Sequence, residues 1–302
     1  MTARRPLFTR RRHALWSLAG GAVALAVMAL SLKTNATAPA ALGLPIPPAP
    51  RRIVSLDFCA DQFLLELADR DQIAALSTQS RAEHSYWRDR AKDISQVRSR
   101  AEAVLALRPD LVVRTYGGDP GIERLLANAG VPLLQLAEGE DFAAVRRNLG
   151  QVASALGHSD RGEAAIARFD QTLAKATRSG TPVTALYVTP GGVQAGSDTS
   201  LGQMMAAAGL TPFDKAHTGW SALPLEALTR AAPQLLISGF MSPGALALYP
   251  WSSARHPLIA ARLKSQPSLA LPGAITACPA SFMADGVLAM AKAGDPLRGA
   301  MR

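Results

Sequence analysis

The chain has 302 residues, of which 48% are hydrophobic and 18% are charged, and its formal net charge is +9. Six of the 32 basic residues but none of the 23 acidic residues lie in the first 38 positions, so the remainder carries a formal charge of only about +3. The high isoelectric point therefore gives little support to nucleic-acid binding, and we expect no nucleic-acid partner. About 260 residues remain, enough for two lobes with their own cores.

The first 40 residues have the layout of an export signal. Arginines at positions 4, 5, 10, 11 and 12 precede an uncharged segment, 14–32, and small residues at 36–41 provide a cleavage site. Residues 9–15 resemble a twin-arginine signal with His13 at the aromatic position, so both twin-arginine and ordinary secretion remain open. A permanent membrane anchor is the alternative. The basic, apolar, small order and the Gly20-Gly21 interruption favour a cleaved signal.

Residues 41–51 are predicted to be an extended tether, because four prolines fall between positions 45 and 50. From residue 52, apolar runs typical of buried strands alternate with helical patterns, which predicts an α/β fold with mainly parallel sheets. The expected strands are 53–56, 73–76, 111–116 and 131–136, and the expected helices are 60–68 and 142–156. Together they form a first α/β lobe over residues 52–158.

A single long helix is predicted over residues 159–179. Ile166, Phe169 and Leu173 recur at the spacing of one buried stripe. Asp160 and Glu163 form a plausible capping box at its start, and the helix ends before Gly180. A second α/β lobe follows over 180–302. Its expected strands are 183–189, 235–238 and 269–271, and its expected helices are 201–208, 225–231, 253–263 and 281–293.

The same pattern occurs once on each side of the long helix. Glu102 precedes Pro109 by seven residues, Glu226 precedes Pro233 by seven, and each proline is followed by a β-favouring apolar run. Proline keeps the preceding residue out of the α region, so each copy predicts a two-turn helix that leads directly into a buried strand. The repetition predicts two equivalent lobes joined by the long helix.

Several segments together resemble the periplasmic substrate-binding proteins of ABC importers that serve cobalamin and ferric siderophores. The residues that carry the resemblance are 52–56, 102–113, 116–118, 156–157 and 226–237, in the right order over nearly the whole chain from 51 to 294. The resemblance implies a monomeric periplasmic receptor whose two lobes, joined by a rigid helix, hold one large corrinoid or ferric siderophore in the cleft between them. It implies small hinge motions, no catalysis and no resident cofactor.

The resemblance also gives Glu102 and Glu226 a role. In similar proteins one glutamate on the outer face of each lobe pairs with arginines of the permease dimer, and such charge pairing sets register and encounter rate. The alternative is that both are helix-start acids, since Ser99 and Glu102 form a capping box and Pro224 precedes Glu226 closely.

The ligand site is predicted from aromatic residues. Ligands of open α/β sheets collect beyond the carboxyl ends of strands, where Phe58, Tyr116 and Phe240 are expected. The remaining candidate contacts lie in predicted loops or at a strand end: Tyr86, Trp87, Arg114, Trp220, Tyr249 and Trp251. Flat rings offer broad contact to a large chelate, although some of them could fill the lobe cores instead. Arg81 and Arg88 add positive charge beside Arg114, which would favour an anionic chelate.

The two cysteines, Cys59 and Cys278, each precede a predicted helix and are each expected to follow a strand end. Both would then face the interlobe cleft. In an oxidising compartment a pair within reach usually forms a disulfide, and we favour that bond over two buried thiols.

Other functions are less well supported by the residues. The histidines after the signal, His84, His158, His217 and His256, show no metal-ligand spacing, so no metal site is predicted, although a haem- or metal-binding receptor of similar fold remains open. A secreted α/β enzyme is the other alternative. Known catalytic motifs are missing, but a scattered site could lie among the following residues: Ser55, Asp57, Asp61, His84 and Asp198.

Overall fold

The computed structural model describes residues 43–299 except 138, 140 and 243. The predicted export signal and its alternative as an anchor therefore lie outside the described residues. Within the described part of the chain, no helix has the length and apolar character needed to cross a membrane.

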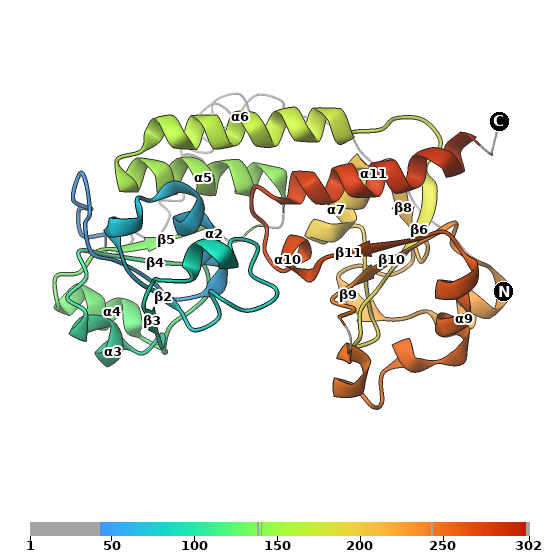
Figure 1. Cartoon of the computed structure of the whole chain (residues 1–302), viewed down its shortest axis with the longest axis horizontal. Helices are drawn as coiled ribbons and strands as arrows, with labels where there is room; N and C mark the ends of the chain where they lie inside the picture. The colour runs from blue at the N-terminus through green and yellow to red at the C-terminus, as the bar shows by residue number, and fades with distance from the viewer. Residues whose placement is uncertain (1–42, 138, 140, 243, 300–302) are drawn as a thin grey trace, which may run out of the picture. The chain divides into compact units, whose positions relative to one another are not determined.

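The first lobe is built on a five-stranded parallel sheet of order β3-β2-β1-β4-β5 (Figure 1). Its elements are β1 (Ile53–Ser55), α2 (Phe58–Leu67), β2 (Ile73–Ser77), β3 (Gln96–Val97), α3 (Ala101–Ala106), β4 (Leu111–Arg114), α4 (Ile122–Asn128), β5 (Leu133–Gln135) and α5 (Phe142–Leu156), with short 3-10 helices η1 (Arg70–Gln72) and η2 (Arg88–Ala91). The central strands are mainly apolar, and all their residues except Arg114 at the end of β4 are buried, as is typical of parallel strands covered on both faces.

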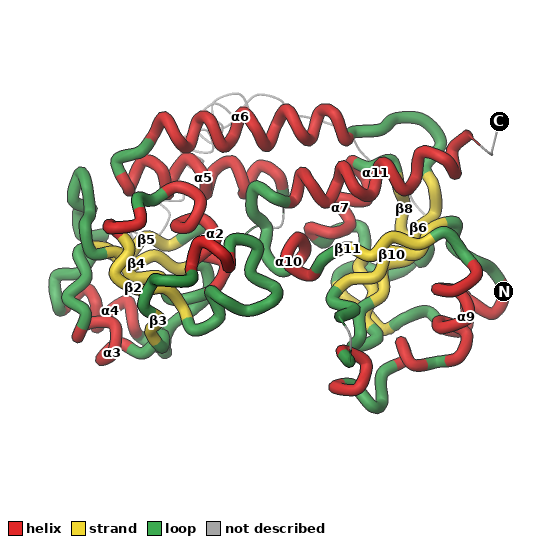
Figure 2. The backbone as a smooth tube through the Cα atoms, viewed as in Figure 1, coloured by secondary structure: helices red, strands yellow, loops and turns green. Residues whose placement is uncertain are grey.

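The second lobe is built on a four-stranded parallel sheet of order β11-β10-β6-β8, with a separate antiparallel pair β7-β9. Its elements are β6 (Val183–Val188), β7 (Val193–Ala195), α7 (Ser200–Ala207), β8 (Leu210–Pro212), β9 (Trp220–Ala222), α8 (Leu225–Arg230), β10 (Leu235–Gly239), α9 (Pro257–Ser265), β11 (Ser268–Leu271), α10 (Gly273–Thr276) and α11 (Met283–Gly299), with 3-10 helices η3 (Ala245–Leu248) and η4 (Ser253–Arg255). Figure 2 shows the helices against both sheets. The predicted α/β class with mainly parallel sheets is confirmed.

Helix α6 (Ser159–Ala176) connects the lobes and contacts both α5 of the first lobe and α11 of the second. One apolar core cluster runs continuously through these helices and both sheets. Gly162 allows the close crossing with α5, because an added Cβ would lie 2.5 Å from the Cβ of Ala153. The lobes are therefore joined by a packed helical layer as well as by the chain.

Several predicted details are wrong. The cap of α6 is His158, whose side chain makes no capping bond, and the cap of α3 is Arg100, so neither predicted capping box forms. The predicted helix 253–263 is broken into η4 and α9, because Pro257 can begin a helix but cannot continue one from His256. The pair β7-β9, strand β8 and helix α4 were not predicted, since each is short and gains its stability from tertiary contacts.

Candidate functional site

Three rings form a continuous row at the carboxyl edge of the first sheet. Phe58, at the start of α2, meets His84 edge-on with ring centroids 4.9 Å apart and faces Tyr116 at 6.3 Å. Tyr116 follows β4 and is 56% exposed. We call His84, Phe58 and Tyr116 the aromatic row.

Asp57 fixes the geometry of this row. Its side chain caps α2 by accepting from the Ala60 N–H at 2.9 Å. Its other oxygen accepts from the N–H groups of Thr115, Tyr116 and Gly117 at 2.8 to 3.1 Å. The carboxylate thus holds the loop after β4 against the start of α2, which places Tyr116 beside Phe58.

A second carboxylate, Asp61, is buried one turn further along α2. It accepts from the backbone N–H of Ser77 at 3.0 Å and from the Ser77 hydroxyl at 2.6 Å. Burial raises the pKa of Asp61 from 3.8 to about 6, and the bonds from Ser77 and Ser55 offset only part of that effect. No ion pair to Asp57 or Asp61 is present among the described residues.

The raised pKa predicts a measurable pH dependence. The folded state holds the Asp61 proton more tightly than the unfolded chain, so its contribution to stability is present below about pH 4 and is lost as pH rises through about 6. Two pKa units correspond to roughly 3 kcal/mol. Asp61→Asn cannot ionise, so its melting temperature relative to the unmodified protein is expected to rise between pH 4 and pH 7.5.

Calorimetry at both pH values checks this expectation. Asp93→Asn, which removes an exposed carboxylate of the same lobe, is the matched control. If the melting temperature of Asp61→Asn differs from that of the unmodified protein by the same amount at both pH values, the pKa of Asp61 is not raised in the folded state.

The second lobe provides residues that face the first lobe across a cavity, and Phe240 is one of them. Phe240 directly follows β10 with φ of 58°, in the left-handed region that a bulky residue rarely adopts. Its ring lies so close to Gly273 that a Cβ there would be 2.4 Å from the ring carbon Cδ1, although the side chain is still 38% exposed. Backbone strain of this kind is concentrated at functional sites.

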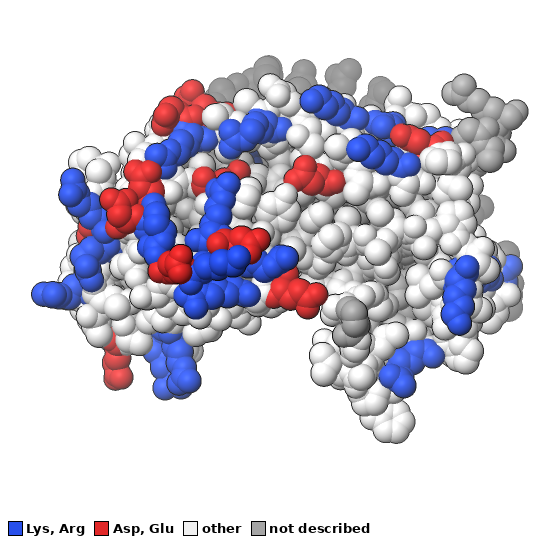
Figure 3. Space-filling view, viewed as in Figure 1, with Lys and Arg blue, Asp and Glu red and all other residues white. Residues whose placement is uncertain are grey.

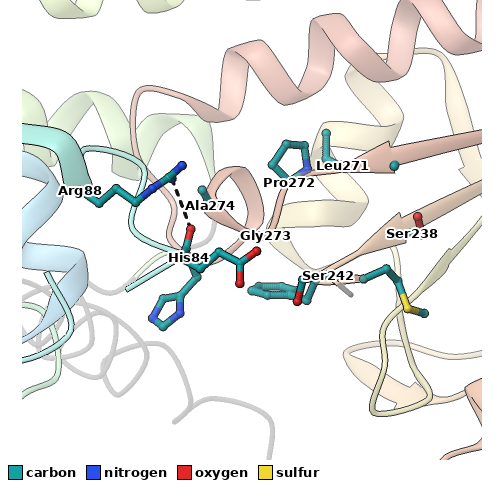
Figure 4. A pocket seen from close by; sticks show the side chains of 12 residues that line it. His84, Arg88, Ser238, Ser242, Leu271, Pro272, Gly273 and Ala274 are labelled. Carbon is teal, nitrogen blue, oxygen red and sulfur yellow. Dashed lines mark hydrogen bonds between the residues drawn. The ribbon is translucent and has the colours of Figure 1, made fainter. Parts of the chain in front are cut away.

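A cavity of about 340 Å³ lies between these two walls, and Figure 4 shows its lining. The first lobe contributes Glu83, His84 and Arg88, and the second contributes Ser238, Phe240, Met241, Ser242 and residues 270–274. We call this space the interlobe cavity. It lies beyond the carboxyl ends of β10 and β11, where ligands of open α/β sheets bind.

The lobes are also in direct contact beside the cavity, and we call this contact region, which contains Cys59, Tyr86 and Cys278, the seam. Cys59 and Cys278 are joined in a disulfide with a Cα–Cα distance of 5.6 Å, as the sequence favoured. The Tyr86 ring stacks on Phe282 with centroids 4.3 Å apart, and the Tyr86 hydroxyl donates to Asp285 of α11 at 3.0 Å. The seam therefore combines a covalent bond, an aromatic stack and a hydrogen bond between lobes.

Glu66 adds a further contact across the seam. It accepts from the Ser281 hydroxyl at 2.6 Å, and burial raises the pKa of this carboxyl. Tyr86 and Trp87 line a small separate cavity here, together with Glu66. The structure does not bring these two rings together with the aromatic row.

The remaining predicted aromatic contacts lie on the surface of the second lobe. Trp220 belongs to β9, not to a loop, and its ring centroid is 6.2 Å from that of Tyr187. Trp220 and Tyr249 are half-exposed, and Trp251 is 97% exposed. They do not line the interlobe cavity, but they are exposed aromatic side chains on the surface of this lobe.

The predicted arginines do not form a positive cluster. Arg81 donates to the carbonyls of Ala91 and Ile94, at 3.1 and 2.6 Å. Arg114 is paired with Glu123 and donates to the Gln135 amide oxygen at 2.5 Å. Arg88 alone reaches the interlobe cavity.

Glu102 and Glu226 occupy equivalent places in their lobes, in the first turns of α3 and α8. Both are exposed, and no ion pair to either is present among the described residues. They are free to pair with charges on another molecule.

The histidines are dispersed. His158 bonds Gln72 at 2.8 Å, and His217 bonds Asp214 at 2.6 Å. The described part of the chain contains no group of three or more His, Cys, Asp or Glu side chains placed to hold a metal ion.

His84, Met241 and the segment 270–274 line the interlobe cavity but were not predicted as site residues from the sequence. Their only sequence signal was position: His84 precedes the aromatic pair at 86–87, and residues 270–274 end a predicted strand.

Comparisons with known proteins fit this geometry. A family model described as periplasmic binding protein matches residues 53–272. No curated protein matches the chain.

Solved structures resemble it over most of its length. The periplasmic haem-binding protein RhuT from Roseiflexus sp. RS-1 is 24% identical over 80% of this chain and 98% of its own, with a TM-score of 0.63. A periplasmic haem-binding protein from Pseudomonas aeruginosa is 26% identical over 81% and 92%, with a TM-score of 0.62. The vitamin B12-binding protein BtuF of Vibrio cholerae is 17% identical over 82% and 97%, with a TM-score of 0.62.

Proposed function

We propose that this chain, which belongs to the periplasmic binding protein family, captures a large metal chelate, corrinoid-like or ferric siderophore-like, between its lobes and delivers it to an ABC importer. Residues 1–40 would direct export, by the twin-arginine or the ordinary route. The receptor would act as a monomer and would carry out no catalytic step.

The observation that carries this proposal is the interlobe cavity, whose lining includes the His84 ring from the first lobe and the Phe240 ring from the second, while Phe58 and Tyr116 lie outside the lining. The aromatic row adjoins one wall through His84, and the strained Phe240 forms part of the other. Rigid rings offer broad contact at little rotamer cost, which suits a large chelate. The exposed rings of Trp220, Tyr249 and Trp251 would extend this contact at the rim.

Delivery would use Glu102 and Glu226. Two exposed carboxylates at equivalent positions of two lobes match a permease dimer that presents one basic site on each subunit.

Haem is the second candidate ligand. His84 supports it, because an imidazole on the cavity wall can serve as an axial ligand of haem iron. Four of the similar structures are named for haem binding.

A fluorescence titration tests the proposal. Purified mature protein would be titrated with cyanocobalamin, ferrichrome and haem, and quenching of tryptophan emission would be followed. Saturable binding of one chelate per chain is expected. If no chelate quenches above the inner-filter control, the receptor function for this ligand class is wrong.

Phe240 provides a matched mutational test. Phe240→Gly removes the ring and the backbone strain of about 1 to 3 kcal/mol together, so we expect little net loss of stability but at least about ten-fold weaker binding. Leu248→Ala, which truncates a 78% exposed side chain of the neighbouring η3, is the control and should bind normally. A Phe240→Gly variant that melts much earlier yet binds normally would make Phe240 structural.

A further inference from the structure

We infer that the interlobe cavity selects its ligand by charge and takes chelates that are neutral or cationic overall in preference to polyanionic ones. This inference rests on the proposed receptor function and narrows its ligand class. The hydrogen bonds, ion pairs and burial of the charged side chains near the aromatic row and the cavity support it.

The basic side chains near the row are already engaged within the protein. Both Arg81 bonds go to backbone carbonyls, and Arg114 is neutralised by Glu123. Anionic ligands are usually held by arginines or lysines that offer free N–H groups. Arg114 therefore has no free charge for a ligand, whereas the exposed Arg81 keeps its charge but has its Nε and one Nη already bonded within the protein.

The lining of the interlobe cavity contains one arginine and one carboxylate. Arg88 is its one basic member and Glu83 its one acidic member, so their charges cancel. Arg88 also donates to the carbonyls of Glu83 and Ser85, each at 3.4 Å, and Figure 4 shows how it lies beside His84. The second lobe contributes only uncharged residues to this lining.

Two buried carboxylates lie beneath the aromatic row. The negative charge of Asp57 is offset by the positive N-terminal end of α2 and by four N–H donors. Asp61 is 0% exposed, and its hydrogen bonds from Ser77 and Ser55 offset only part of the effect of burial. A buried charge is weakly screened, so its field extends into the adjoining cavity.

Tyr116 lies beside these two carboxylates. Burial, and to a smaller extent the charges of Asp57 and Asp61, raise the pKa of its phenol. The same negative field that opposes a phenolate at Tyr116 opposes an anionic ligand group stacked there. In contrast to the charged first lobe, the face of the second lobe seen in Figure 3 is largely uncharged, and the few charged side chains on it are mostly Lys and Arg.

Binding of four probes tests the inference. Cyanocobalamin and ferrichrome are neutral, haem carries two propionates, and ferric enterobactin carries three negative charges. We expect at least one neutral probe to bind at least about ten-fold more tightly than either anionic probe at pH 7.5 and low salt. Asp61→Asn should tighten binding of the anionic probes several-fold and leave neutral probes unchanged, whereas Asp93→Asn should alter neither.

Ser242→Lys is a second variant, which adds a positive charge to the uncharged second-lobe side of the cavity and leaves the hydrogen bonds of Asp61 unchanged. It should also favour the anionic probes. Tight binding of haem or ferric enterobactin with no binding of either neutral probe would overturn the charge selection but leave the receptor function intact. An unchanged preference in both Asp61→Asn and Ser242→Lys would overturn it as well. Failure of all four probes to bind would instead refute the proposed function, and the inference with it.

Discussion

Replacing Cys59 and Cys278 by serine is expected to lower the free energy of unfolding by about 2 to 5 kcal/mol. The disulfide closes a loop between positions 219 residues apart, so its removal frees the unfolded chain more than a short loop would. Urea unfolding of the mature protein, compared with the double variant, measures the difference.

The same change should accelerate ligand release. The disulfide joins the lobes at the seam, and without it their separation is limited by α6 and by noncovalent contacts, among them the shared apolar core, the Tyr86–Phe282 stack and the hydrogen bonds of the seam. Stopped-flow release of the bound chelate, with and without dithiothreitol, reports this effect. Tyr86→Phe is the matched control, because it removes only the bond to Asp285. Equal stability and equal off-rates before and after reduction would show that the disulfide does not restrain the lobes.

The double change Glu102→Gln and Glu226→Gln is expected to reduce uptake through the cognate permease by at least about ten-fold while ligand affinity stays the same. Loss of two desolvated charge pairs at an interface costs 2 kcal/mol or more each. Uptake of labelled ligand by cells, with receptor abundance verified, measures it.

Glu163→Gln is the control, since Glu163 is an exposed carboxylate on α6, away from both predicted docking helices. Neither docking glutamate makes a side-chain capping bond in the structure, so the variant's melting temperature should change little. If cells with the double variant take up ligand at the normal rate, neither glutamate contributes to permease docking.

The order of helices and strands could be predicted because local sequence patterns determine it. Each Glu-to-Pro segment marks a short helix before a buried strand, and the apolar stripe of 159–176 marks the connecting helix. The disulfide could be favoured because Cys59 lies just beyond β1 and Cys278 follows the β11–α10 segment, so both approach the lobe interface.

The site was harder to predict because its features depend on contacts between distant residues. Nothing near Tyr86 indicates that its ring stacks on Phe282, so its loop position suggested a ligand contact. Likewise the charge of Arg114 is cancelled by Glu123 only once β4 and α4 are packed together. The positive φ of Phe240 has no sequence signal, because glycine is the residue that usually marks such a position.

Native mass spectrometry of the protein exported by its own host tests the receptor function without a chosen probe. We expect a mature chain that has lost the N-terminal signal, retains one disulfide and carries one chelate with a mass in the range of a corrinoid, ferric siderophore or haem. A chain that emerges bare, and stays bare after incubation with extracts containing all three chelate classes, would contradict the claim that it is a chelate receptor.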